Sequence, residues 1–213
     1  WGHWNSIANY FSNHNITFIK FNFSHNGTAI NTPQEFSNLS QFKHNNYTKE
    51  LFDFDIVINF LKRNYLKVGD WNNLNLIGHS RGGPIALITG NKRNDVKKII
   101  TWASVPKLNY AWEDESIKTE WQRNGVRHIR NGRTNQDMPL GYQLIEDFNK
   151  NKALLDLSIV LPKCKKPVYL IHGTADLAVK PNAVEILKKS IQTCKTTLIE
   201  GAKHVFGGQH PFK

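Results

Sequence analysis

Hydrophobic and polar residues alternate with two different periods in the first third of the chain. Apolar side chains such as Trp4 and Ile7 recur at helical spacing and predict an opening helix. Residues 16–24 (ITFIKFNFS) instead alternate apolar with polar side chains and are rich in β-forming types, which predicts a strand. A long polar stretch, residues 25–49, then leads to an amphipathic helix over residues 51–65.

Shorter apolar runs dominate the rest of the chain and alternate between the two kinds of element. The pattern predicts strands over residues 74–78, 99–103, 168–171 and 197–199, and helices over residues 84–89 and 183–191. Strands that alternate with helices are typical of βαβ units. The sequence therefore predicts an α/β fold with a mainly parallel sheet flanked by helices.

Residues 107–162 interrupt this alternation with more than fifty residues that contain no clear strand pattern. A structureless loop of that length is improbable in a compact domain, so we expect a helical lid or cap. The whole chain has 213 residues, the size of one domain with an insertion. We predict a single domain over residues 1–213, with the lid over residues 107–162 covering the functional site.

Composition and charge narrow the class of protein further. No apolar run approaches the roughly 18–20 residues that cross a bilayer, which argues against a membrane-spanning segment. The formal net charge of +11 would suit an anionic partner, but the lysines are spread along the chain and no nucleic-acid-binding motif accompanies them. We interpret the charge as a solvated surface and predict neither a nucleic-acid partner nor a membrane partner.

The chain contains two cysteines, Cys164 and Cys194, too few for a disulfide framework and not in metal-binding spacing. Free thiols fit a reducing compartment, although a disulfide between two neighbouring strands is the alternative. No signal peptide is visible, and the chain opens at Trp1. We predict a cytoplasmic location.

The most specific motif follows the strand predicted over residues 74–78. Gly78, Ser80 and Gly82 form G-x-S-x-G between a strand and a helix. Two small residues allow a strained turn that holds the serine Oγ clear of the backbone. A serine alone is a poor nucleophile, so a base and an orienting acid are expected downstream.

Both partners follow in the expected order. Asp176 comes just after the strand over residues 168–171, and His204 comes just after the strand over residues 197–199. The carboxyl ends of parallel strands share one edge of a sheet, where ligands bind in open α/β sheets. We therefore expect Ser80, Asp176 and His204 to meet there.

With these residues the chain resembles the α/β-hydrolase superfamily, in particular serine esterases and the dienelactone-hydrolase-like and prolyl-oligopeptidase-like enzymes. The segments that match are residues 78–83 (GHSRGG), 171–176 (IHGTAD) and 201–206 (GAKHVF). The resemblance implies that Ser80 is the nucleophile, His204 the general base and then acid, and Asp176 the group that orients His204. It also implies that the backbone N–H of Arg81 is one oxyanion donor.

The superfamily takes its second oxyanion donor from a loop after an earlier strand. The chain opens in the helix that follows this loop, so the resemblance implies a second donor upstream of Trp1. That earlier strand lies beside the nucleophile strand in the superfamily, and a gap there would leave backbone groups unpaired. We therefore expect at least one N-terminal strand and a glycine-containing loop before Trp1.

Other polar residues have competing interpretations. His172 and His210 are the nearest rival bases, and His172 fits a structural role better; we expect His79, inside the motif, to pack. No histidine has a partner at metal-ligand spacing, so we predict no metal and no cofactor. The predicted lid carries arginines that could hold an anionic substrate group and aromatic residues that could line a pocket, with solvent exposure and packing as the respective alternatives. These residues are Arg127, Arg130, Arg133, Tyr110, Trp112, Trp121 and Tyr142.

These observations together predict a serine hydrolase that cleaves small-molecule carboxylic esters through a Ser-His-Asp triad and an acyl-enzyme. A peptidase or a thioesterase uses the same three residues and stays an alternative. A non-catalytic binding member of the fold is the alternative from another class.

Overall fold

A computed structural model describes residues 4–67, 69–132 and 134–208. The chain divides into two compact units, one formed by residues 1–59, 111–151 and 209–213, and the other by residues 60–110 and 152–208. We call them unit 1 and unit 2. The predicted lid range is divided between them, and its role as a cover stays a prediction.

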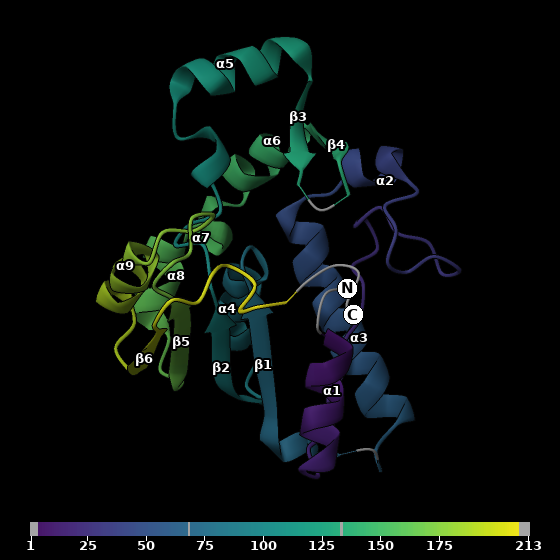
Figure 1. Cartoon of the computed structure of the whole chain (residues 1–213), viewed down its shortest axis with the longest axis vertical. Coiled ribbons are helices and arrows are strands. Elements are labelled where there is room, and N and C mark those ends of the chain that lie inside the picture. The colour runs from purple at the N-terminus through teal and green to yellow at the C-terminus, as the bar shows by residue number, and fades with distance from the viewer. Residues whose placement is uncertain (1–3, 68, 133, 209–213) are drawn as a thin grey trace. The chain divides into compact units, whose positions relative to one another are not determined.

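Unit 2 contains a four-stranded parallel sheet with the order β1-β2-β5-β6 (Figure 1). Its strands are β1 (Leu74–His79), β2 (Val96–Trp102), β5 (Val168–Gly173) and β6 (Cys194–Ile199). Its helices are α4 (Gly82–Lys92), α7 (Lys152–Leu155), α8 (Leu157–Val160) and α9 (Asn182–Ser190), with 3-10 turns η1 (Trp71–Asn73) and η3 (Leu161–Lys163). The α/β class and the parallel sheet predicted from the sequence are therefore confirmed.

Helix α4 explains how the sheet obtains its core. Eight of its residues, from Gly83 to Gly90, are buried, so the helix is apolar on nearly every side. It packs against β1 and β2, while α9 contacts β5 and β6. Ile99 of β2 is fully buried, and a Cβ on Gly90 would lie 2.5 Å from its Cδ1 atom. The small residue thus lets α4 lie directly on the sheet.

Unit 1 combines helices with a two-stranded antiparallel hairpin. Its elements are α1 (Trp4–Asn13), α2 (Leu39–Lys43), α5 (Glu115–Asn124), β3 (Val126–Asn131), β4 (Gln136–Gly141) and α6 (Gln143–Lys150). Helix α3 (Tyr47–Asn64) lies mostly in this unit, and the 3-10 turn η2 (Tyr110–Trp112) begins at its border. Within the unit, α5 contacts β3 and α2 contacts β4 (Figure 1).

The hairpin contradicts the expectation that residues 107–162 contain no strand. Strand β3 has no buried residue and carries charged side chains where a half-buried strand would show apolar alternation. In β4, Met138, Pro139 and Gly141 are buried, but they do not alternate with polar residues. Pro139 also interrupts the strand pattern, yet it pairs with His128 across the hairpin. The sequence pattern therefore missed this hairpin.

The strand expected over residues 16–24 is also wrong. This segment has no regular secondary structure and pairs with no described strand. Its alternating aromatic side chains pack against helices instead: Phe18 stacks on Phe11 of α1 at 5.1 Å, and Phe21 meets Phe54 of α3 edge to face at 5.2 Å. The period of two thus reflects packing against helices in unit 1.

Candidate active site

Ser80 occupies a strained turn between β1 and α4. Its φ angle is +55°, in the left-handed region that a residue with a side chain seldom adopts. Its backbone N–H donates to the Trp102 carbonyl at 2.8 Å, and its own carbonyl accepts from the Gly83 amide at 3.0 Å and the Val105 amide at 3.3 Å. These three bonds hold the turn and fix the direction of the serine side chain.

Only one of the two motif glycines, Gly78, makes a close approach in this turn, and the other close approach is made by Gly83, just after the motif. A Cβ on Gly78 would lie 2.2 Å from the Gly82 carbonyl oxygen, and a Cβ on Gly83 would lie 2.2 Å from the Ser104 Oγ atom. A Cβ on Gly82 would meet nothing within 4 Å. Gly78 and Gly83 are therefore the small residues that the turn needs, and Gly82 is not.

Asp176 and His204 follow β5 and β6, at the same edge of the sheet as Ser80. The segments that lead from each strand to its site residue lie close together, since a Cβ on Gly173 would be 2.1 Å from the Ala202 carbonyl oxygen. The Ala175 amide donates to that same carbonyl at 3.0 Å. The absence of a side chain at Gly173 thus lets the Asp176 turn touch the His204 turn.

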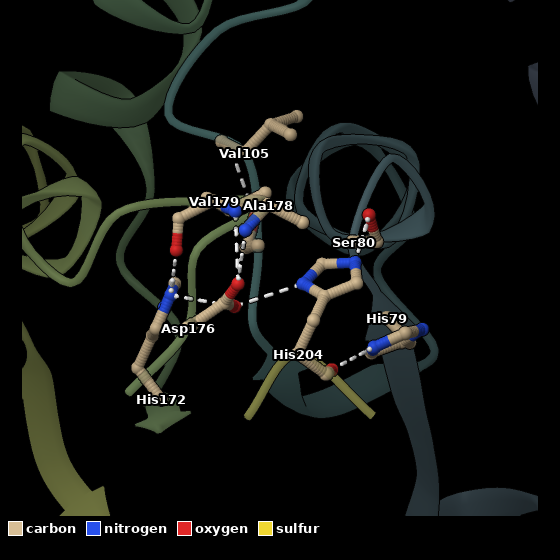
Figure 2. A network of polar contacts seen from close by, with 9 residues as sticks. His79, Ser80, Val105, His172, Asp176, Ala178, Val179 and His204 are labelled. Atoms are coloured by element: carbon tan, nitrogen blue, oxygen red, sulfur yellow. Dashed lines mark hydrogen bonds and ion pairs between the residues drawn. The ribbon is translucent and has the colours of Figure 1, made fainter. Parts of the chain in front are cut away.

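The three predicted site residues form a continuous chain of polar contacts (Figure 2). The His204 Nε2 atom lies 3.0 Å from Ser80 Oγ, and His204 Nδ1 lies 2.8 Å from Asp176 Oδ2. The Asp176 side chain is fully buried and the His204 side chain is 19% exposed. When the carboxylate is ionised it only accepts, so Nδ1 carries the proton and Nε2 is left to accept one from the Ser80 hydroxyl.

Asp176 is surrounded by donors on both oxygens. Oδ1 accepts from the backbone amides of Ala178 and Val179, each at 2.9 Å. Oδ2 accepts from His204 and also lies 3.2 Å from His172 Nε2. Two backbone amides and the His204 ring thus fix the orientation of the buried Asp176 side chain.

His172 is not a rival base in this geometry. Its Nε2 atom lies 2.9 Å from the Val179 carbonyl, which can only accept, so this nitrogen is a donor. The residue is 1% exposed, and its ring reaches both ends of the turn from Asp176 to Val179 (Figure 2). The structural role expected for His172 is consistent with these contacts. The other rival, His210, lies outside the described residues.

Arg81 follows Ser80 and is the N-cap residue of α4, with φ −59° and ψ −27°. Its backbone N–H is the first amide after the serine and belongs to the positive end of the α4 helix dipole. This position is compatible with the oxyanion role that the resemblance implies. The second donor, expected upstream of Trp1, stays a prediction.

The predicted lid residues of unit 1 have structural partners within that unit. Trp112 and Trp121 are 5% and 1% exposed and meet edge to face at 6.0 Å, which fills the core of the unit. Arg127 donates to the Ala111 carbonyl at 2.8 Å and lies over the Trp121 ring, while Arg130 pairs with Asp137 at 3.1 Å. Packing and surface pairing account for these four side chains.

The other predicted lid residues, and the two cysteines, are accounted for as follows. Tyr110 is 44% exposed and Tyr142 is half-buried, so neither fills a core. Arg133 lies outside the described residues. Cys164 is buried and Cys194 half-buried, both as free thiols. Within the described part of the chain, no cluster of three or more His, Cys, Asp or Glu side chains could hold a metal ion.

Comparison with known proteins places this geometry in a known fold. No protein-family model and no curated protein sequence matches the chain. Among solved structures, the metagenome-derived lipolytic enzymes LipS and LipT are similar over 95% of this chain and 79% of theirs, with a TM-score of 0.65 and 14% identity. Est1E from Butyrivibrio proteoclasticus is similar over 76% of this chain and 64% of its own, with a TM-score of 0.59 and 20% identity.

A monoacylglycerol lipase from Paleococcus ferrophilus is similar over 76% of this chain and 68% of its own, with a TM-score of 0.55 and 15% identity. The chain spans 62% of the esterase domain from Rhodothermus marinus and 64% of Est1E, less than two thirds of each. The chain therefore has the α/β-hydrolase fold, as its three motifs predicted. In the described residues, no helix is both long enough and apolar enough to cross a membrane.

Proposed function

We propose that this protein is a serine hydrolase that cleaves carboxylic esters through an acyl-enzyme on Ser80. The observation that carries the proposal is the contact chain from Ser80 Oγ through the His204 ring to Asp176, with distances of 3.0 and 2.8 Å. Several proteins with a similar structure are described as esterases or lipases. The likeness and the contact chain support the same reaction class.

In the acylation step His204 acts as general base. Its Nε2 atom accepts the Ser80 hydroxyl proton while Oγ forms a bond to the ester carbonyl carbon. The imidazolium that forms is stabilised by Asp176, which accepts the Nδ1–H bond and carries the opposite charge. The carbonyl oxygen gains the negative charge, and the Arg81 amide donates to it.

Collapse of this tetrahedral intermediate breaks the bond to the alkoxy oxygen. The imidazolium gives its proton to that oxygen, so the product leaves as a neutral alcohol and the acyl group stays on Ser80. Water then replaces the alcohol: His204 takes a proton from water as the hydroxyl attacks the acyl carbon. The same proton returns to Ser80 Oγ when the carboxylic acid leaves.

Hydrolysis of p-nitrophenyl esters of increasing acyl length tests this proposal. We expect release of p-nitrophenol by the wild-type protein and its loss in Ser80→Ala and His204→Ala. Ser12→Ala, at an exposed position of α1, is the matched control and should behave as wild type. An amide and a thioester of the preferred acid, assayed in parallel, separate an esterase from a peptidase or a thioesterase.

The outcomes distinguish the alternatives. Preference for the ester, with activity lost in both site variants, supports the proposal. Preference for the amide or the thioester keeps the three residues in their roles but replaces the substrate class. A folded wild-type protein that turns over none of the three substrates, and is not acylated by them, contradicts the catalytic proposal and favours a binding function.

A further inference from the structure

His204 lies in a segment that has neither helix nor strand. The described residues from 200 to 208 consist of turns and irregular backbone. Gly201 and Phe206 have positive φ angles, +69° and +50°, and the Phe206 amide bonds only locally, to the Lys203 carbonyl at 3.0 Å. Gly201 and Ala202 at its start are tied to the turn after β5, through Thr174 and Ala175, but such a segment is still less constrained than a strand or helix.

A side-chain hydrogen bond ties this segment to β1, the strand that ends just before Ser80. The His79 Nε2 atom lies 2.8 Å from the His204 carbonyl oxygen, 125 residues away in sequence. A carbonyl oxygen can only accept, so Nε2 carries the proton and donates it. The two imidazole rings also lie side by side, with centroids 4.9 Å apart and planes inclined by 42° (Figure 2).

We propose that His79 is a positioning residue that holds His204 at its distance from Ser80. This inference rests on the function proposed above. His79 is the last residue of β1 and directly precedes Ser80, so one rigid turn carries both the nucleophile and the donor that holds the base. The His79 bond therefore acts together with the Asp176 contact to set the Ser80–His204 separation.

The proposal predicts a specific kinetic defect. Without the donor, the His204 segment relaxes and the imidazole spends less time within reach of Ser80 Oγ. A misplacement of about 1 Å at a reacting group can cost on the order of 100-fold in rate. We expect kcat to fall by about 10- to 100-fold with KM changed less than about threefold, because His79 does not bind substrate in this account.

Three variants and one control separate positioning from packing. His79→Gln keeps an N–H donor near the place of Nε2, His79→Asn is polar but too short to reach the carbonyl, and His79→Leu has no donor. His128→Leu, an exposed histidine of β3, is the control. The measurements are the second-order rate constant of labelling by a fluorophosphonate, kcat and KM for an ester, and the thermal midpoint of each variant.

The proposal expects His79→Gln to label within about threefold of wild type, while Asn and Leu label about 10- to 100-fold more slowly. Equal labelling of all variants, or equal slowing of all three His79 variants, overturns it. If the Leu variant does not fold, the Gln and Asn pair decides. Wild-type protein that fails to label contradicts the proposed function itself, which is a different result from an unchanged rate in the His79 variants.

Discussion

His204 and Asp176 meet through a 2.8 Å contact between Nδ1 and Oδ2, although 28 residues separate them in sequence. The contact joins a partly exposed imidazole to a fully buried carboxylate. Three hydrogen bonds hold the carboxylate, two from the backbone amides of Ala178 and Val179 and one from His204. The acceptor facing Nδ1 therefore favours the tautomer of His204 that leaves Nε2 free to accept a proton from Ser80.

The first prediction concerns Asp176→Asn. The two amides of Ala178 and Val179 need an acceptor, so the asparagine oxygen takes the place of Oδ1 and its NH2 group faces His204. His204 then keeps its proton on Nε2 and cannot accept one from Ser80. We expect kcat to fall by about 10⁴-fold, the magnitude typical of this change, with the fold retained by circular dichroism. An Asn variant within tenfold of wild type would argue against an ionised orienting acid.

A second prediction concerns His172. His172→Leu leaves the partly buried Val179 carbonyl without its donor and removes the imidazole that lies 3.2 Å from Asp176 Oδ2. A buried polar group left unpaired costs about 1–3 kcal/mol, so we expect the free energy of unfolding in urea to fall by that amount. The loss of activity should be smaller than in Asp176→Asn. Unchanged stability in the Leu variant would show that these contacts are dispensable.

The nucleophile turn yields a third prediction, in which neighbouring glycines differ. Gly78→Ala forces a Cβ to within 2.2 Å of the Gly82 carbonyl oxygen, which the backbone cannot easily avoid. We expect it to destabilise the protein by about 1–3 kcal/mol. Gly82→Ala meets open space and begins a helix, so its stability should equal or slightly exceed that of wild type. Thermal or urea unfolding of the pair measures the difference; equal losses would refute this description of the turn.

The fourth prediction concerns the dependence of stability on pH. Hydrogen bonds from Arg93 lower the pKa of Asp95 well below its ordinary value, and Lys62 adds to the effect. The carboxyl group is thus more acidic in the folded chain than in the unfolded one, where its pKa is about 3.9. Its stabilising effect is complete above that pH and is lost as the pH falls through the folded value.

We therefore expect wild type to be more stable than Asp95→Asn near pH 6. The difference should shrink as the pH falls below about 4, because the wild-type carboxyl then approaches its own protonation. Urea unfolding of both proteins at several pH values measures this. A stability difference that grows toward low pH has the wrong sign and would rule out a depressed pKa for Asp95.

Much of the fold follows from local patterns in the sequence. Strands β1, β2 and β5 were predictable because buried parallel strands contain short apolar runs, and α4 because it is apolar on nearly every side. Strand β6 is mostly exposed, and only its last residues, 197–199, were predicted. The hairpin β3–β4 was not, since β3 has no buried residue and the buried residues of β4 include a proline and a glycine and do not alternate with polar ones. Residues 16–24 were wrongly predicted as a strand for the opposite reason: their aromatic side chains alternate with polar ones, but they pack on α1 and α3 without forming a strand.

The candidate site likewise contains residues that the sequence predicted and contacts that it did not. Ser80, Asp176 and His204 were visible because each follows a strand within a recognisable motif. The contacts of His79 and His172 were not visible: His79 meets a carbonyl 125 residues away, and His172 depends on how the turn after β5 folds back. Long-range contacts of this kind leave no spacing pattern in a single sequence.

The most direct test of the account is the intact mass of the protein after treatment with a fluorophosphonate. An activated serine displaces fluoride, so the account predicts one adduct per chain, on the peptide that contains Ser80. It also predicts no adduct in Ser80→Ala and a rate in His204→Ala reduced by a factor on the order of 10⁴ or more. A folded wild-type protein that stays unlabelled, or one labelled at another residue, would contradict the central claim that Ser80 is an activated nucleophile.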